Sequence, residues 1–105
     1  MVEKSQVDLE ARDKHDMTPL LWTALKGLLP VVQYLCEQGA DNEARDWMGK
    51  TPLLWAAAHG QLPVVQYLCE QGADKEARSE YGWTQLHYAA HNGHSDVVQY
   101  FEGLK

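Results

Sequence analysis

The chain has 105 residues, of which 45% are hydrophobic, so it is large enough for one folded domain and too apolar to be disordered. It carries 15 Asp and Glu against 9 Lys and Arg, and the resulting formal charge of −6 argues against a nucleic-acid-binding protein. No apolar run approaches the roughly 20 residues of a membrane-spanning helix, and residues 1–16 contain no signal-peptide core. We therefore expect a cytoplasmic protein with no membrane segment.

The two cysteines, Cys36 and Cys69, occupy equivalent places in two copies of one motif. Packed helices lie roughly 8–10 Å apart, whereas the Cα atoms of a disulfide lie within about 7 Å of each other. A bridge between them is therefore not expected. The sequence predicts two packed thiols in a reducing compartment.

The sequence repeats itself every 33 residues. The motif TPLLW at Thr18–Trp22 recurs unchanged at Thr51–Trp55, and a looser copy, TQLHY, lies at Thr84–Tyr88. The longer motif VVQYLCEQGAD at Val31–Asp41 recurs unchanged at Val64–Asp74. Identity of this length at a constant offset indicates a repeat architecture, in which each copy is one supersecondary unit.

The first copy is predicted to begin with a short helix. Thr18 is a good N-cap, and Pro19 suits the opening helical position, where its missing N–H costs nothing. Leu20 and Ala24 then share one face at helical spacing. Gly27 is expected to end this helix.

A second helix is predicted to open near Pro30 and to stop at Gly39 in the usual C-terminal role. Helices of about two turns are marginal alone, so each pair must stack on its neighbour. The apolar side of this helix would consist of Val31, Val32, Leu35 and Cys36.

The segments between the helix pairs read as tight turns. DWMGKT and SEYGWT are each built around a glycine, Gly49 or Gly82. The tripeptide EAR leads into every turn, at Glu10–Arg12, Glu43–Arg45 and Glu76–Arg78. Stacked repeats would align these into a ladder of alternating charge, which we interpret as a solvated or mutually paired edge worth little per pair.

The stretch DWMGKTPLLWAAAHGQLPVVQYLCEQGADKEAR resembles the ankyrin repeat, whose pattern is D-x-x-G-x-T-P-L-H-x-A-A-x-x-G-H-x-x-V-V-x-x-L-L-x-x-G-A-D. The resemblance implies an all-α ankyrin-repeat solenoid of stacked helix-turn-helix pairs with projecting β-hairpin loops. Repeats would span 13–45, 46–78 and 79–105, the last a truncated C-terminal cap, after a leader and partial repeat tail at 1–12. Members of this family bind other proteins through the hairpin tips and the concave face of the first helices. The family has no catalytic residues to carry over.

Several positions depart from the family pattern. The histidine after T-P-L survives only as His87, with Leu21 and Leu54 in the other copies, so apolar packing is expected to hold those loops. Gln85 replaces the helix-opening proline of the last copy. Glu102 stands where the other copies have cysteine, as suits an end that no further repeat covers.

The copies differ most where the resemblance places the binding surface. Trp and Tyr dominate the energetic centres of protein interfaces, and Met is enriched there. The concave side of the first helices would carry Trp22, Trp55 and Tyr88, followed a turn later by Leu25, Lys26, Ala58, His59, His91 and Asn92. The turn tips would contribute Lys14, His15, Met17, Trp47, Met48, Lys50, Glu80, Tyr81 and Trp83. An alternative is that Trp22, Trp55 and Tyr88 pack only against their own helices. Trp47 and Trp83 have little repeat core to enter.

Catalysis and metal binding are not expected. His87, His91 and His94 have a spacing that can ligate zinc, but the family gives His87 and His94 roles in stabilising turns. No nucleophile–base pair stands out, so we predict no enzyme activity and no cofactor.

Two hypotheses of function remain. In the first, the chain is a binding module that recognises a protein partner. Its near-identical repeats resemble those of an engineered ankyrin-repeat binder, although a recently duplicated natural array would look similar. In the second, it is a structural repeat scaffold or array fragment that self-associates through its apolar face.

Overall fold

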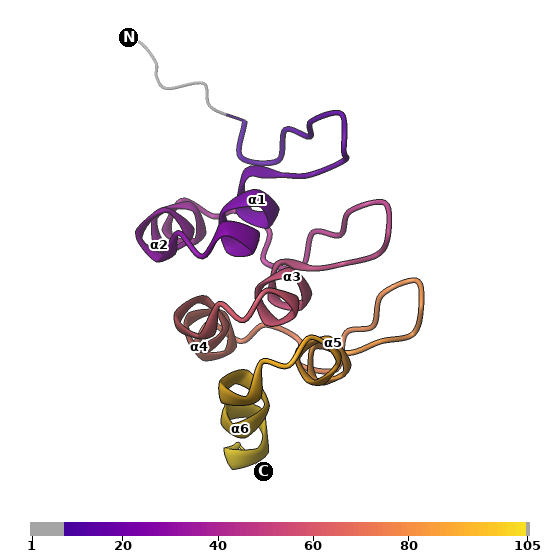
Figure 1. Ribbon diagram of the computed structural model, residues 1–105. Coiled ribbons are helices and arrows are strands. Elements are labelled where there is room, and N and C mark those ends of the chain that lie inside the picture. The colour runs from indigo at the N-terminus through magenta and orange to yellow at the C-terminus, as the bar shows by residue number, and fades with distance from the viewer. Residues whose placement is uncertain (1–7, 105) are drawn as a thin grey trace, which may run out of the picture.

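A computed structural model describes residues 8–104, which contain six helices and no strand. The helices are α1 (Pro19–Lys26), α2 (Leu29–Glu37), α3 (Pro52–Ala58), α4 (Leu62–Glu70), α5 (Gln85–His91) and α6 (Ser95–Gly103). Figure 1 shows them as three stacked pairs. The all-α solenoid predicted from the repeat is therefore confirmed.

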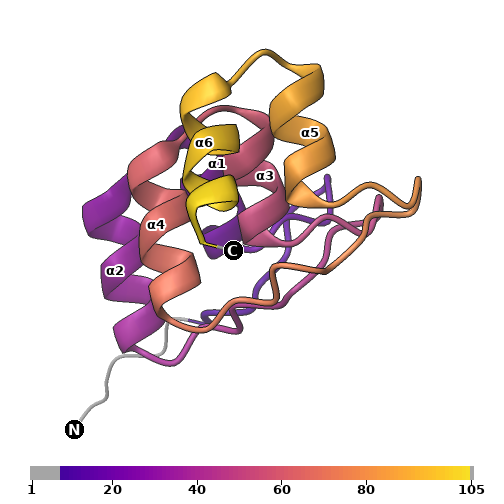
Figure 2. The same ribbon diagram turned by 90° about the horizontal axis from the view of Figure 1, so that it is seen from below.

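The first and second helices of the pairs form two separate rows. Helix α1 packs against α3 and α3 against α5, while α2 packs against α4 and α4 against α6. The loops that precede α1, α3 and α5 all project to the same side of the stack (Figures 1 and 2). Equivalent residues of successive loops are therefore neighbours in space.

Each projecting loop is a tight turn closed by backbone hydrogen bonds. In the second loop the N–H of Asp46 donates to the carbonyl of Lys50 at 3.1 Å, and the N–H of Gly49 donates to the carbonyl of Asp46 at 2.9 Å. Gly49 has φ +77°, a left-handed conformation that glycine adopts without steric cost. The turns predicted around Gly49 and Gly82 are confirmed.

The first helices begin as their sequence predicts. The hydroxyls of Thr18 and Thr51 accept the N–H groups of Leu21 and Leu54, each at 3.2 Å, and a proline follows each cap. Both leucines are fully buried, which confirms that apolar packing replaces the family's histidine in these copies. The last copy keeps that residue, His87, whose Nδ1 accepts the N–H of its N-cap threonine at 2.9 Å.

Polar side chains also join successive pairs at the junction between their helices. Gln61 Nε2 donates to the carbonyl of Leu25 at 3.0 Å, and His94 Nε2 lies 3.0 Å from the carbonyl of Ala58. The His94 ring lies against Gly60, where an added Cβ would stand 2.5 Å from Nδ1. Glycine at this position therefore permits both the left-handed turn and the close approach of the next repeat.

The core runs along the interior between the two rows of helices. Leu20, Leu53 and Leu68 are among its fully buried members. Val31 was predicted to lie on an apolar inner side, but it is 42% exposed, whereas its counterpart Val64 is completely buried. The reason is that the first pair covers Val64, and no described residue covers Val31 in the same way.

Cys36 and Cys69 are free thiols, as predicted. Both are half-buried, and this burial raises the pKa of each thiol above its usual value. The thiolate, which is the reactive form, is therefore less populated at neutral pH.

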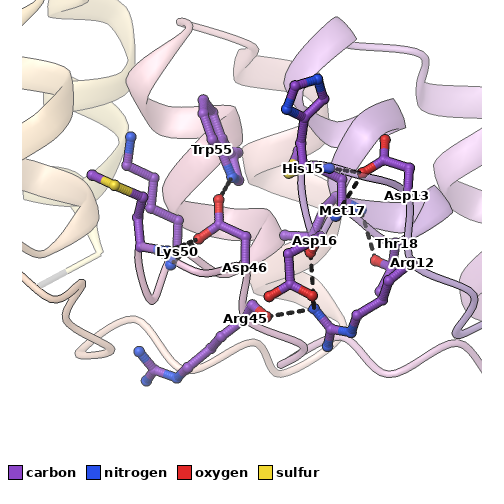
Figure 3. Close-up of polar contacts among 12 residues, drawn as sticks. Arg12, Asp13, His15, Asp16, Met17, Thr18, Arg45, Asp46, Lys50 and Trp55 are labelled. Carbon is purple, nitrogen blue, oxygen red and sulfur yellow. Dashed lines mark hydrogen bonds and ion pairs between the residues drawn. The ribbon is translucent and has the colours of Figure 1, made fainter.

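The EAR segments form a ladder whose partners differ from those predicted. Arg45 donates to the carbonyls of Gly49 at 2.8 Å and Arg78 at 2.6 Å, and Glu43 accepts the N–H of Asp74 at 3.0 Å. Arg12 repeats this contact by donating to the carbonyl of Arg45 at 2.7 Å (Figure 3). Charged side chains thus bind the backbone of the next repeat while remaining exposed, so of the two predicted alternatives the solvated edge is confirmed and the mutual pairing of charges is wrong. Within residues 8–104 the one ion pair joins Arg12 to Asp16, at 3.5 Å.

Candidate binding groove

Two adjoining hollows lie between the projecting loops and the first helices. The larger has a volume of about 620 Å³ and the smaller about 240 Å³, and Trp55 lines both. The larger is lined by Lys50, Trp55, Ala58, His59, Tyr81, Trp83, Tyr88, His91 and Asn92. The smaller is lined by His15, Met17, Trp22, Leu25, Asp46, Trp47 and Trp55. We call these two hollows together the groove.

The groove brings together most of the residues predicted to bind a partner. Of that set, only Lys14, Lys26, Met48 and Glu80 line neither hollow. Lys26 nevertheless lies beside the groove, because its ammonium stands 5.6 Å from the ring centre of Trp22. The periodic spacing of the predicted residues therefore places them along one continuous surface.

A loop carboxylate holds Trp22 and Trp55, the tryptophans on the first helices, by their indole nitrogens. Asp46 Oδ2 accepts the Nε1–H of Trp55 at 2.8 Å, while its Oδ1 accepts the backbone N–H groups of Met48 and Lys50, each at 2.9 Å (Figure 3). Asp13 and Trp22 form the same pair one repeat earlier. The indole bond is the largest cause of a lowered pKa at Asp13. These bonds fix each ring against its own loop.

The last repeat makes the same contact with different chemistry. Ser79 replaces the aspartate and Tyr88 replaces the tryptophan, and the tyrosine hydroxyl donates to Ser79 Oγ at 2.7 Å. Sequence reasoning missed these pairs. The available signal was a fixed separation of nine residues, together with the joint replacement of Asp by Ser and Trp by Tyr. These bonds tie each ring to the loop of its own repeat, and a contact of the rings with a partner stays a prediction.

Lys50 crosses from its loop onto the aromatic surface. Its ammonium lies 4.1 Å from the ring centre of Trp55 and 5.0 Å from that of Tyr88, which is cation–π geometry. Burial lowers the pKa of Lys50, and the nearby Asp46 partly offsets that effect. The lysine therefore links the second and third repeats at the centre of the groove.

A model of the family described as ankyrin repeats (3 copies) matches residues 1–79 and 49–102 of the chain. The chain belongs to the ankyrin-repeat family. No curated protein matches its sequence. Ankyrin repeats are generally protein-interaction modules and form a non-catalytic family. The groove lies where the family resemblance predicted a binding surface.

The aromatic residues of this ankyrin stack differ widely in exposure. Trp47 and Tyr81 are 69% and 67% exposed at the loop tips, as predicted for tip residues. Met17 is also predicted at a tip, but it is only 5% exposed and lines the smaller hollow. Tyr88 and Ala58, at 7% each, form the floor of the groove.

Trp83 does not project from a tip, contrary to its prediction. Its ring packs against Tyr88 and His91, with ring centres 5.0 Å and 5.1 Å apart, beside buried Leu54 and Ala58. Trp83 occupies the same repeat position as Lys50 and Met17, which all end their loops next to the helix. Trp83 is half-buried in the wall of the groove, whereas Trp47 is mostly exposed.

Each of the three histidines considered for zinc binding contacts another residue of the protein. His87 and His94 use ring nitrogens in the bonds described above, while His91 makes an edge-to-face contact with Trp83. Among residues 8–104 there is no cluster of three or more side chains arranged to hold a metal ion. In the same range, every helix is too short or too polar to cross a membrane.

Proposed function

We propose that the chain is a protein-binding module whose partner occupies the groove. The observation that carries this proposal is a continuous aromatic surface with Trp47 and Tyr81 exposed at its rim and Trp55, Trp83 and Tyr88 beneath them. Large exposed apolar patches on proteins usually mark contact surfaces. Aromatic anchors at the centre of an interface supply most of its binding energy.

The internal bonds of the groove support this role. Asp46 holds Trp55 and Ser79 holds Tyr88, so these rings are fixed before a partner arrives. Binding then costs little side-chain entropy, which is the general advantage of a preorganised surface. A typical footprint would be on the order of 800 Å² on each partner.

The near identity of repeats 13–45 and 46–78 supports an engineered or recently duplicated array, with a third repeat at 79–105 and residues 1–12 before the first. Residues 1–7 lie outside the described part of the chain. The half-buried free thiols support a reducing, cytoplasmic location.

The test compares two exposed aromatic residues on different faces. Random peptides displayed on phage are selected for binding to the chain, and the dissociation constants of the best peptides are measured by calorimetry. Trp47→Ala should weaken binding by about 2 kcal/mol. Tyr34 is an exposed aromatic residue on α2, in the row of second helices, and Tyr34→Ala should change binding by less than about 0.5 kcal/mol. Equal effects of the two variants would contradict a groove site.

The same variants also test whether the chain self-associates through the groove. Sedimentation equilibrium of the unmodified chain should give a monomer if the groove serves a different protein. A discrete dimer that Trp47→Ala dissociates would instead make the partner a second copy of the chain.

A further inference from the structure

The ammonium of Lys50 is held in the groove without an anionic partner. It is half-buried against the rings of Trp55 and Tyr88, and within residues 8–104 no acceptor lies within ion-pairing distance of it. Ring faces satisfy an ammonium only in part, because its three N–H donors still prefer oxygen acceptors. A desolvated cation of this kind is a strong point of attachment for an incoming anion.

The nearest carboxylate is already engaged. Asp46 accepts one indole and two backbone N–H groups of the loop that it organises. Asp13 is engaged in the same way by Trp22 and the backbone of its own loop. Burial lowers the pKa of Lys50, and the charge of Asp46 acts from a distance to raise it. Neither acid lies within ion-pairing distance of the ammonium, which leaves room for a closer carboxylate.

The larger hollow holds a cation although the whole chain is acidic. That cation is Lys50, and the residues that line this hollow include no acid. The acid of the groove is Asp46, which lines the smaller hollow. Burial, ahead of the charge of Lys50, lowers the pKa of His59, so the neutral form of this histidine is favoured and Lys50 supplies the charge of the larger hollow. The second helices, which form the other row of the stack, carry several acids, namely Glu37, Glu70, Asp96 and Glu102.

We infer that the partner presents a carboxylate side chain beside an aromatic or aliphatic side chain. The carboxylate would pair with Lys50, and the apolar side chain would enter the hollow between Trp55 and Trp83. This inference rests on the proposed function and specifies the chemistry of the same site. Opposed charges across an interface raise the association rate and select among partners.

Two other ligand chemistries fit the groove less well. A cationic ligand would have to displace Lys50 from the rings that it already covers. Single-stranded nucleic acid would stack on the tryptophans, but its phosphates would meet the repulsion of a chain with net charge −6. A protein segment with one or two acids avoids this repulsion.

The peptides selected from the random library provide the first test. Peptides whose binding depends on Trp47 should be enriched in Asp or Glu within a few positions of a Phe, Trp, Leu or Ile. Enrichment of neutral or basic peptides that still require Trp47 would overturn the acidic chemistry and leave the groove proposal intact. Loss of the Trp47 dependence itself would overturn the groove proposal.

A double-mutant cycle provides the second test. Lys50→Gln should lower the affinity for an acidic peptide about tenfold. For the same peptide with its Glu replaced by Gln, the substitution should change the affinity by less than about twofold. Lys50→Arg should retain most of the affinity, and Lys75→Gln, outside the groove, should have no effect. Thermal melting of each variant shows whether it is folded. Additive effects in the cycle, or equally tight binding of an oligothymidylate, would rule out the carboxylate contact.

Discussion

Asp46 and Trp55 are nine residues apart in the chain, yet Oδ2 of the aspartate lies 2.8 Å from the indole nitrogen of the tryptophan. The same carboxylate organises the turn through two backbone N–H groups. One side chain therefore couples the conformation of a projecting loop to the position of a groove ring. A change at either residue should affect both.

Removing the indole donor tests this coupling. Trp55→Phe keeps an aromatic ring but leaves a buried carboxylate oxygen without its partner, so it should lower the free energy of unfolding by about 2 kcal/mol. Trp47→Phe alters a ring that is mostly solvent-exposed, so it should change the free energy of unfolding by less than about 0.5 kcal/mol. Urea denaturation followed by circular dichroism measures both. Similar small losses in the two variants would show that the bond contributes nothing.

The equivalent pair in the first repeat predicts a pH effect. The indole of Trp22 is the largest cause of the lowered pKa of Asp13, ahead of the backbone N–H of Met17. Because the folded pKa lies below the ordinary value, the resulting stability is present above that value and is lost as pH falls through the folded pKa. In Trp22→Phe the pKa of Asp13 should rise towards its ordinary value. Carboxyl titration by NMR measures it, and an unchanged pKa would contradict the assignment.

The junction glycines predict a difference between equivalent positions. Gly60 and Gly93 both have left-handed φ angles, +69° and +78°, but only Gly60 lies against the next repeat. Gly93→Ala should cost about 1 kcal/mol for its backbone conformation alone. Gly60→Ala should cost at least about 1 kcal/mol more, because its Cβ would displace the ring of His94. Equal costs, measured by urea denaturation, would mean that the His94 contact yields without loss.

The EAR ladder predicts a salt-insensitive contribution to stability. Arg45 donates to carbonyls of its own loop and of the next repeat, whereas Arg78 donates to one carbonyl, that of Gly82, at 2.8 Å. Arg45→Met should therefore lower the unfolding free energy by about 1–2 kcal/mol, and Arg78→Met by less than that. Both losses should persist in molar salt, since ions screen charge pairs more strongly than bonds to the backbone. A loss that disappears in salt would favour the ion-pair interpretation.

Much of the fold was predictable because its signals are local. The Thr18-Pro19 cap and the period of 33 residues identify the helices and their repetition without knowledge of any contact. The family resemblance placed the binding surface on the first helices and the loop tips. The predictions of the helices and of their repetition are confirmed, because a stack of similar units brings equivalent positions into one row, whereas the binding surface stays a prediction.

The remaining features depend on neighbours that the period does not identify. The partner of Arg45 is a carbonyl of the next repeat, and the partner of Asp46 is an indole across the loop, so neither follows from charge pattern alone. Met17, Lys50 and Trp83 occupy one repeat position, yet their environments differ. Met17 is buried, the ammonium of Lys50 lies over the Trp55 ring, and Trp83 packs against Tyr88. Side-chain size and the neighbouring repeat decide these outcomes.

The sequence by itself determined the length of the repeat, the Thr-Pro start of the first helix in two copies and the glycine turns between the helix pairs. Only the tertiary structure decided which residues meet solvent. Val31 and Val64 lie in identical eleven-residue segments, yet one is exposed and the other buried. The physical reason is that capping and turn formation depend on a few adjacent residues, whereas burial depends on the surface that the neighbouring pair of helices provides.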